Sequence, residues 1–219
     1  MTHLKRITMP KTWPLARKGY KYIVKPLAGK KIEFCLPAMI ILRNILKIGR
    51  TRKEIKKILQ EKDVLVNGKI ISEEAYPVGF YDIISLPKME KYYRIELSGK
   101  GKLSPIEISK EKAMKRYSKI VNKTIIKKNK IQINFKDGLN TLAEKNLQAK
   151  VNDCIVFDLQ NKKILKIIPF EKGSHVIIIG GKHCGKEGNI EKIEGDITTV
   201  KTNSNSIKTI KQNLFVCEK

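Results

Sequence analysis

The spacing of apolar and polar positions predicts two consecutive helices in the first third of the chain. The run AMIILRNILKI, residues 38–48, follows Pro37, a residue suited to the first turn of a helix. Its apolar side chains recur at helical spacing and predict one broad buried face, formed by Met39, Leu42, Ile45 and Leu46. Thr51 and Glu54 have the spacing of a capping box, in which each side chain bonds a backbone N–H of the other residue. A second helix capped by Thr51 is therefore expected.

Alternating positions further along the chain predict strands. Asn67-Gly68, flanked by apolar residues, is a strong signal for a β-hairpin, because both residues tolerate positive φ in a type I′ turn. A turn at 76–79 and a closing strand at 82–86 are expected to follow. The stretch 91–171 alternates in short segments separated by turns, which predicts a small, mostly β domain. No arrangement of catalytic side chains is recognisable in it.

The stretch 173–193 combines two predicted strands with a basic, glycine-rich loop. An apolar run at 176–179 leads into the loop GGKHCGK, residues 180–186, and alternation then resumes to 193. Such a loop can offer backbone N–H groups and lysines to phosphate. It resembles the KOW motif of ribosomal and transcription-factor proteins, with Gly185 at the motif's glycine and Lys182, His183 and Lys186 as further RNA-binding candidates. The alternative is an ordinary β-hairpin whose glycines serve only the turn.

Composition favours a polyanionic partner. The 219 residues include 46 Lys and Arg against 21 Asp and Glu, a formal net charge of +25. This charge attracts nucleic acid and releases its counterions, although charge alone also fits an anionic membrane. No apolar run approaches the roughly 20 residues of a spanning helix, and no signal-peptide segment is recognisable, so we expect a cytoplasmic protein. The length predicts two to four small modules.

Cysteine spacing argues against a zinc site. The four cysteines are scattered without a CxxC pair, and the three histidines do not supply the missing ligands. His183 and Cys184 are neighbours but have no second pair nearby. We therefore expect reduced thiols and neither a metal nor a cofactor.

Residues 1–34 predict an extended basic arm. Residues 1–32 contain no acid, three prolines interrupt any helical period, and Trp13, Tyr20 and Tyr22 are interleaved with the charges. We expect this segment to order only on RNA, with cations on phosphates and aromatic rings on unstacked bases. The alternative is a solubilising tail. The RNA-binding candidates in the arm are Lys5, Arg6, Lys11, Trp13, Arg17 and Lys18.

The two helices, the hairpin and the closing strand together resemble the S-four RNA-binding module, which recognises RNA by its shape and phosphates. The resemblance implies an RNA-binding face on the helices and the hairpin turn. Its members here would be Arg43, Lys47, Arg50, Arg52, Lys53, Lys56, Asn67, Gly68 and Lys69. For a single lysine of this set a solvated helix face is the better interpretation. The clustering of the whole set, interrupted by one acid, favours RNA.

The order of these segments resembles the archaeal and eukaryotic small-subunit ribosomal protein family S-four-e over nearly the whole chain. The matching blocks are residues 3–6, 10–13, 35–37, 42–44, 76–85 and 150–153. The resemblance implies an α+β multi-module protein: a basic N-terminal arm at 1–34, an S-four module at 35–90, a mostly β central domain at 91–171 and a KOW-type small β-barrel with a short tail at 172–219. A short tail and many Lys and Ile residues favour an archaeal member.

The family implies a structural constituent of the small ribosomal subunit that binds its large rRNA beside neighbouring ribosomal proteins. It implies no enzymatic activity, membrane or small-molecule substrate. An rRNA-modifying enzyme such as a pseudouridine synthase would need a catalytic Asp in a sizeable α/β domain, for which the stretch 91–171 leaves little room. A KOW-bearing elongation factor would need a polymerase-binding domain. A non-ribosomal RNA chaperone or assembly factor is the remaining alternative.

Overall fold

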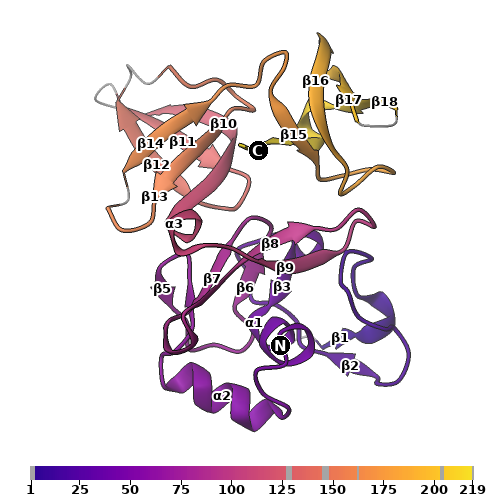
Figure 1. Ribbon diagram of the computed structural model, residues 1–219, viewed down its shortest axis with the longest axis vertical. Helices are drawn as coiled ribbons and strands as arrows, with labels where there is room; N and C mark the ends of the chain where they lie inside the picture. Colours follow the sequence, from indigo (N-terminus) through magenta and orange to yellow (C-terminus); the bar gives the residue numbers. More distant parts are fainter. Residues whose placement is uncertain (1–2, 127–129, 145–147, 162, 203–204, 219) are drawn as a thin grey trace. The chain divides into compact units, whose positions relative to one another are not determined.

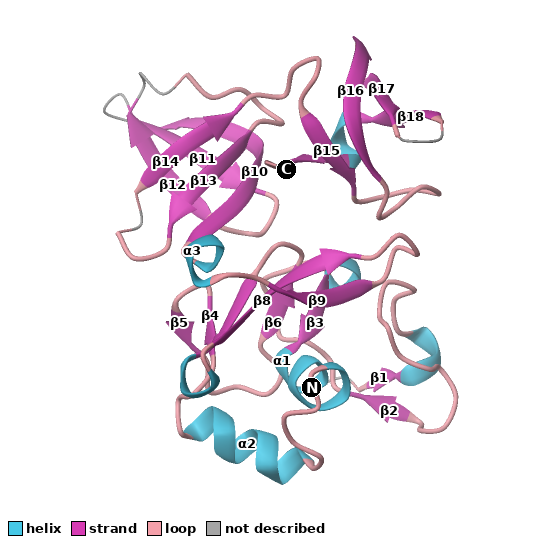
Figure 2. Cartoon of the chain, in the orientation of Figure 1, coloured by secondary structure: helices cyan, strands magenta, loops and turns pink. Residues whose placement is uncertain are grey.

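The computed structural model describes residues 3–126, 130–144, 148–161, 163–202 and 205–218. The chain forms two compact units, Met1–Leu97 with Lys102–Arg116 and Ser98–Gly101 with Tyr117–Lys219. Both units are built mostly from short antiparallel strands with few helices (Figure 1, Figure 2). In the described part of the chain, no helix has the length and hydropathy to cross a membrane.

The first unit contains a five-stranded antiparallel sheet with the order β5-β4-β7-β8-β9. Its strands are β4 (Leu65–Val66), β5 (Lys69–Ile70), β7 (Ile83–Leu86), β8 (Lys91–Leu97) and β9 (Leu103–Glu107). The turn between β4 and β5 is the predicted one, since Asn67 has a φ of 50° and Gly68 a φ of 73°. A short 3₁₀ segment, η4 (Pro87–Met89), precedes β8.

The expected boundary at residue 90 falls inside this sheet. Strand β8 pairs with β7 from Ile83↔Arg94 to Leu86↔Lys91, and β9 pairs with β8. Ile95 and Leu103 are fully buried. These strands therefore extend the sheet of the first unit, where they bury their apolar face, and do not begin the central domain.

The first predicted helix is shorter and wider than its apolar pattern suggests. α1 (Ala38–Ile40) passes directly into a π-helical segment, η3 (Ile41–Ile45), in which the Leu46 N–H donates to the Ile41 carbonyl at 2.9 Å. It ends before residue 48, because Lys47 adopts a φ of 55° in the left-handed region. Met39 and Leu42 are buried as predicted.

The second helix, α2 (Arg52–Gln60), begins at the predicted capping box. The Glu54 N–H donates to Thr51 Oγ1 at 3.2 Å, and the Glu54 carboxylate accepts from the backbone N–H groups of Thr51 and Arg50. Ile55 and Leu59 are fully buried, and strands β3 (Cys35–Pro37) and β6 (Pro77–Gly79) form a buried antiparallel pair in the same unit. This core positions the exposed basic face of α2.

The N-terminal segment is folded into the first unit, contrary to the expectation of an arm that orders only on RNA. It contains β1 (Leu4–Lys5), η1 (Arg6–Thr8), β2 (Tyr22–Ile23) and η2 (Ile32–Phe34), with β1 and β2 paired. Trp13 is only 1% exposed, and its indole N–H donates to the Ile32 carbonyl at 3.3 Å. The Thr12 carbonyl accepts from the Leu103 N–H at 2.8 Å. Burial of the indole and these hydrogen bonds order the segment without RNA.

The second unit contains two five-stranded antiparallel sheets. The first has the order β12-β11-β10-β13-β14 and follows a short helix, α3 (Lys110–Ala113). Its strands are β10 (Lys115–Ile126), β11 (Lys130–Phe135), β12 (Asn140–Glu144), β13 (Cys154–Asp158) and β14 (Ile164–Ile168). Its core includes Ile120, Ile133, Phe135, Ile155 and Phe157, with the two phenylalanine rings edge to face at 5.3 Å. The predicted mostly β central region is thus present from β10 onward.

The second sheet of this unit has the order β18-β17-β16-β15-β19. Its strands are β15 (His175–Ile178), β16 (Glu187–Glu194), β17 (Ile197–Lys201), β18 (Ser206–Ile210) and β19 (Leu214–Val216), with η5 (Lys211–Asn213) before the last. β15 and β16 pair antiparallel around the basic loop, as the alternation predicts.

Candidate nucleic-acid interface

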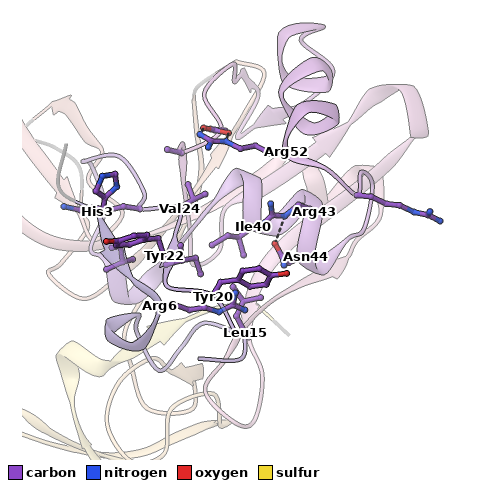
Figure 3. A pocket seen from close by; sticks show the side chains of 16 residues that line it. His3, Arg6, Leu15, Tyr20, Tyr22, Val24, Ile40, Arg43, Asn44 and Arg52 are labelled. Atoms are coloured by element: carbon purple, nitrogen blue, oxygen red, sulfur yellow. Dashed lines mark hydrogen bonds and ion pairs between the residues drawn. The ribbon is translucent and has the colours of Figure 1, made fainter. Parts of the chain in front are cut away.

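An open pocket of about 820 Å³ in the first unit is lined by the N-terminal segment and the helical region (Figure 3). The N-terminal residues in its wall include His3, Arg6, Leu15, Tyr20, Tyr22 and Lys25. The helical region contributes Ile40, Arg43, Asn44, Arg50 and Arg52, and Glu74 and Ala75 complete the wall. The pocket thus joins basic residues from the two segments that the sequence analysis assigned separately to RNA.

The cations of the pocket differ in their partners. The Arg52 guanidinium forms a bidentate pair with Glu74, and this hydrogen bond lowers the pKa of the Glu74 carboxyl. Arg43 donates to the side-chain oxygen of Asn44 at 3.1 Å. Within the described part of the chain, neither Arg43 nor Arg50 forms an ion pair. The charge of Arg52 is thus largely offset by Glu74, whereas Arg43 and Arg50 act on Glu74 and Glu54 only from a distance, where their charges help to lower the pKa of each carboxyl.

Two tyrosines in the pocket are exposed. Tyr20 is 76% and Tyr22 49% exposed. The Arg6 guanidinium lies 5.5 Å from the centroid of the Tyr20 ring, and the Arg6 Nε donates to the Ala16 carbonyl at 2.6 Å. The His3 and Tyr22 rings lie 5.3 Å apart. The pocket therefore combines exposed aromatic faces with positive charge.

A buried carboxylate ties the end of the N-terminal segment to the rest of the first unit. Asp82 is 1% exposed and pairs with Lys30, and Arg116 lies 3.5 Å from its other oxygen. It also accepts from the Gly79 N–H at 2.6 Å and the Asn67 amide at 2.8 Å. Burial alone raises the pKa of Asp82, but the charges of Lys30 and Arg116 and these hydrogen bonds outweigh it and hold the pKa below its ordinary value.

Three family models match consecutive parts of the chain. They are the RS4NT (NUC023) domain at residues 2–29, the S4 domain at 39–84 and the ribosomal family S4e at 89–164. The small ribosomal subunit protein eS4 of Archaeoglobus fulgidus is 33% identical over 223 residues, covering 99% of this chain and 93% of that protein. The chain belongs to the ribosomal S4e family. The resemblance inferred from the sequence is thereby confirmed.

Further relatives of this S4e protein are also archaeal. The eS4 of Methanospirillum hungatei is 40% identical over 191 residues, covering 86% of this chain and 78% of that protein. The crystal structure of the 30S ribosomal protein S4e from Thermoplasma acidophilum has a TM-score of 0.72 and 28% identity, covering 83% of this chain and 94% of that chain. The expectation of an archaeal member of the family is supported by these relatives.

The predicted RNA-binding residues of the S4 domain fall into three groups. Arg43, Arg50 and Arg52 line the pocket. Lys47, Lys53 and Lys56 are exposed outside its wall, with Lys56 Nζ 3.9 Å from the Glu74 carboxylate. Gly68 and Lys69 are exposed at the hairpin. The Asn67 side chain is used internally: it donates to Asp82 and accepts from the Ile83 N–H at 2.9 Å, so its role is to hold the hairpin turn.

The predicted residues of the N-terminal segment are also divided. Arg6 lies in the pocket wall, and Lys5, Lys11, Arg17 and Lys18 are exposed or half-exposed outside it. Arg17 donates to the Met9 carbonyl at 3.2 Å. Trp13 was expected to stack on RNA bases, and this prediction is wrong, because the indole is buried in the first unit. The exposed aromatic surface belongs instead to Tyr20 and Tyr22.

Three backbone donors of the basic loop after β15 are used internally. The N–H groups of Cys184, Gly185 and Lys186 donate to the carbonyls of Gly181, Ile178 and His183 at 3.3, 2.7 and 3.2 Å. Gly185 is buried with a φ of 87°, so the glycine serves the conformation of the loop and does not offer its N–H to phosphate. Lys182 is exposed, and His183 and Lys186 are half-exposed. At residues 184–186 an anion would therefore meet side chains and not these backbone N–H groups.

Several residues that shape this interface are not among the predicted site residues. Tyr20 and Tyr22 are predicted only as aromatic residues interleaved with the charges, and neither Lys30 nor Asp82 is predicted to form a buried ion pair. Among the described residues, no three His, Cys, Asp or Glu side chains are grouped so that they could hold a metal ion. The local sequence carries no signal that distinguishes the buried Trp13 from the exposed Tyr20.

Proposed function

We propose that this protein is a structural constituent of the small ribosomal subunit in the cytoplasm, where it binds the large rRNA of that subunit. The observation that carries the proposal is the meeting of Arg6 from the N-terminal segment with Arg43 and Arg50 of the S4 domain in one basic pocket. Relatives that span nearly the whole chain are named small ribosomal subunit protein eS4. The family is one of ribosomal structural proteins and not of enzymes.

The proposed mode of binding is recognition of RNA shape and phosphates by several basic surfaces. A net charge of +25 supports it, because each contact between a cation and a phosphate releases a counterion. The exposed Lys53, Lys56 and Lys69 would neutralise phosphates beside the pocket. A-form grooves hide most base identity, so specificity would come from the spacing of these surfaces.

The proposed module organisation is a basic N-terminal segment at 1–34 and an S4 domain from residue 35, which share the first unit with β8 and β9. A β domain follows from β10 to residue 171, and a KOW-type small β-barrel occupies 172–219. The paired β15 and β16 around a loop with Lys182 and Lys186 support the last assignment. In this proposal the KOW-type loop is a second anchor on rRNA through its lysines. Neighbouring ribosomal proteins would contact surfaces left uncovered by RNA.

The test is sedimentation of a native lysate, washed at high salt, through a sucrose gradient with detection of this protein. Stoichiometric retention on the small subunit is the expected result, because many phosphate contacts together resist the wash. Release into the top fractions, or substoichiometric trapping on particles, would contradict the proposal and support the alternative of an RNA-binding assembly factor or chaperone.

A further inference from the structure

The pocket of the first unit exposes two aromatic rings, Tyr20 and Tyr22. Tyr20 is 76% exposed and forms no part of the buried core, whereas Trp13 in the same segment is 1% exposed and does. A large ring left in water gains nothing for folding, because stabilisation comes from the apolar area removed from water. Exposure alone assigns no role, since Ile7 and Ile125 are similarly exposed, but Tyr20 also lines the basic pocket.

The surroundings of Tyr20 leave part of the ring open while fixing its place. Arg6 lies 5.5 Å from the ring centroid, and the Arg6 guanidinium is itself anchored by its hydrogen bond to the Ala16 carbonyl. Such a cation–π contact places the guanidinium over one face of the ring, and Tyr20 as a whole remains 76% exposed. In Figure 3, Tyr20 is drawn among the side chains that line the pocket, with Arg6 and Asn44 beside it in this view. The ring thus offers an aromatic surface inside a basic pocket.

The chemistry of the pocket matches a nucleotide. Bases stack on aromatic rings whatever their sequence, and phosphates pair with arginine guanidinium groups. Arg43 and Arg50 line the same pocket and form no ion pair among the described residues. A volume of about 820 Å³ lies in the range of roughly 300–1,000 Å³ found for pockets that bind small molecules. A base inside a duplex could not reach the ring, because both of its faces are already stacked.

We propose that this pocket binds one unstacked nucleotide of a single-stranded or bulged RNA segment. The base stacks on the open part of the Tyr20 ring, and the flanking phosphates pair with Arg43 and Arg50. The proposal rests on the proposed function as an rRNA-binding protein. It adds a site for one unpaired nucleotide beside the exposed lysines that are proposed to bind RNA phosphates.

The first experiment measures the affinity of the full-length protein for a fluorescent hexaadenylate and for an RNA duplex. Tyr20→Leu should weaken hexaadenylate binding about tenfold, the loss of one stacked base, and should leave duplex binding within about twofold. Tyr20→Trp should retain hexaadenylate binding, since an indole also stacks. Tyr92→Leu, on β8 and outside the pocket wall, is the matched control and should behave like the unaltered protein.

The second experiment tests the phosphate contacts with two substitutions that remove the same charge. Arg50→Gln should flatten the dependence of log affinity on log salt for hexaadenylate by about 0.7, one single-strand phosphate contact. Lys57→Gln, an exposed cation on α2 outside the pocket wall, should leave the slope unchanged. Equal effects of the two substitutions would overturn the phosphate assignment.

The outcomes separate this proposal from the proposed function. Unchanged hexaadenylate binding by Tyr20→Leu, or an equal loss of duplex binding, would overturn the nucleotide site even if the unaltered protein sediments with the small subunit. Failure of the unaltered protein to sediment with the subunit would overturn the ribosomal role, while a Tyr20-dependent preference for hexaadenylate would still establish the site. Because the Tyr20 ring is exposed, the Tyr20→Leu and Tyr20→Trp variants should both fold. Circular dichroism checks this.

Discussion

Replacing Asp82 by alanine should destabilise the first unit and loosen the N-terminal segment that forms one wall of the pocket. The change removes a carboxylate that is 1% exposed and leaves Lys30 and Arg116 without its charge. It also removes the acceptor of the Gly79 N–H and the Asn67 amide. Removing one partner of a buried ion pair costs about 3–5 kcal/mol, because the remaining charge stays buried and uncompensated. This is a large share of the roughly 5–15 kcal/mol that stabilises a typical domain.

The assay is urea unfolding followed by tryptophan fluorescence. The chain has 1 tryptophan, Trp13, and its buried indole lies in the same unit as Asp82, so its emission reports directly on that unit. Asp63→Ala is the matched control, because Asp63 pairs with the exposed Lys88. The control should change the free energy of unfolding far less, since exposed ion pairs are screened by water and salt.

The pH dependence of the same measurement gives a second criterion. The pKa of Asp82 is lower in the folded protein than its ordinary value of 3.8, so the carboxylate contributes stability above that value. This contribution is lost as the pH falls through the folded pKa, and the difference between the unaltered protein and Asp82→Ala should shrink in acid. Equal destabilisation by Asp82→Ala and Asp63→Ala, or a difference independent of pH, would refute the reasoning.

Three further predictions follow from particular side chains. Trp13→Ala should lower the free energy of unfolding by about 3–5 kcal/mol, because a buried indole is removed. Thermal unfolding followed by circular dichroism measures this, and an unchanged midpoint temperature would mean that the N-terminal segment does not pack on the first unit. Burial lowers the pKa of Lys119 to about 7, although its ammonium donates to the Lys211 and Leu214 carbonyls at 2.7 and 2.6 Å. The unfolded state then binds more protons, so the free energy of unfolding should rise between about pH 7 and 10, and Lys119→Met should abolish this rise in urea titrations. Replacing Lys11 and Lys18 together by glutamine should flatten the salt dependence of rRNA binding by about 0.7–0.9 per lost contact in filter binding, whereas the same change at Lys110 and Lys112 should alter it less.

Elements set by neighbouring residues were predictable from the sequence. The capping box of Thr51 and Glu54 formed because its hydrogen bonds span three residues, and Asn67-Gly68 formed its turn because both positions accept positive φ. The family was recognisable because short blocks of this kind recur in order along the chain. The first helix was predicted too long because its apolar spacing carries no sign of the π-helical hydrogen bond from Leu46 to Ile41 or of the left-handed Lys47.

The local elements, the charge and the family of this protein thus follow from its sequence alone. Which side chains are available for binding depends on long-range packing. Trp13 and Tyr20 lie in the same basic segment. The Trp13 indole is buried and donates to the Ile32 carbonyl, whereas Tyr20 remains exposed beside Arg6. Contacts between residues far apart in the chain also assigned β8 and β9 to the first unit and placed Arg6 in one pocket with Arg43 and Arg50. Such contacts depend on how the whole unit packs, and no spacing of nearby residues encodes them.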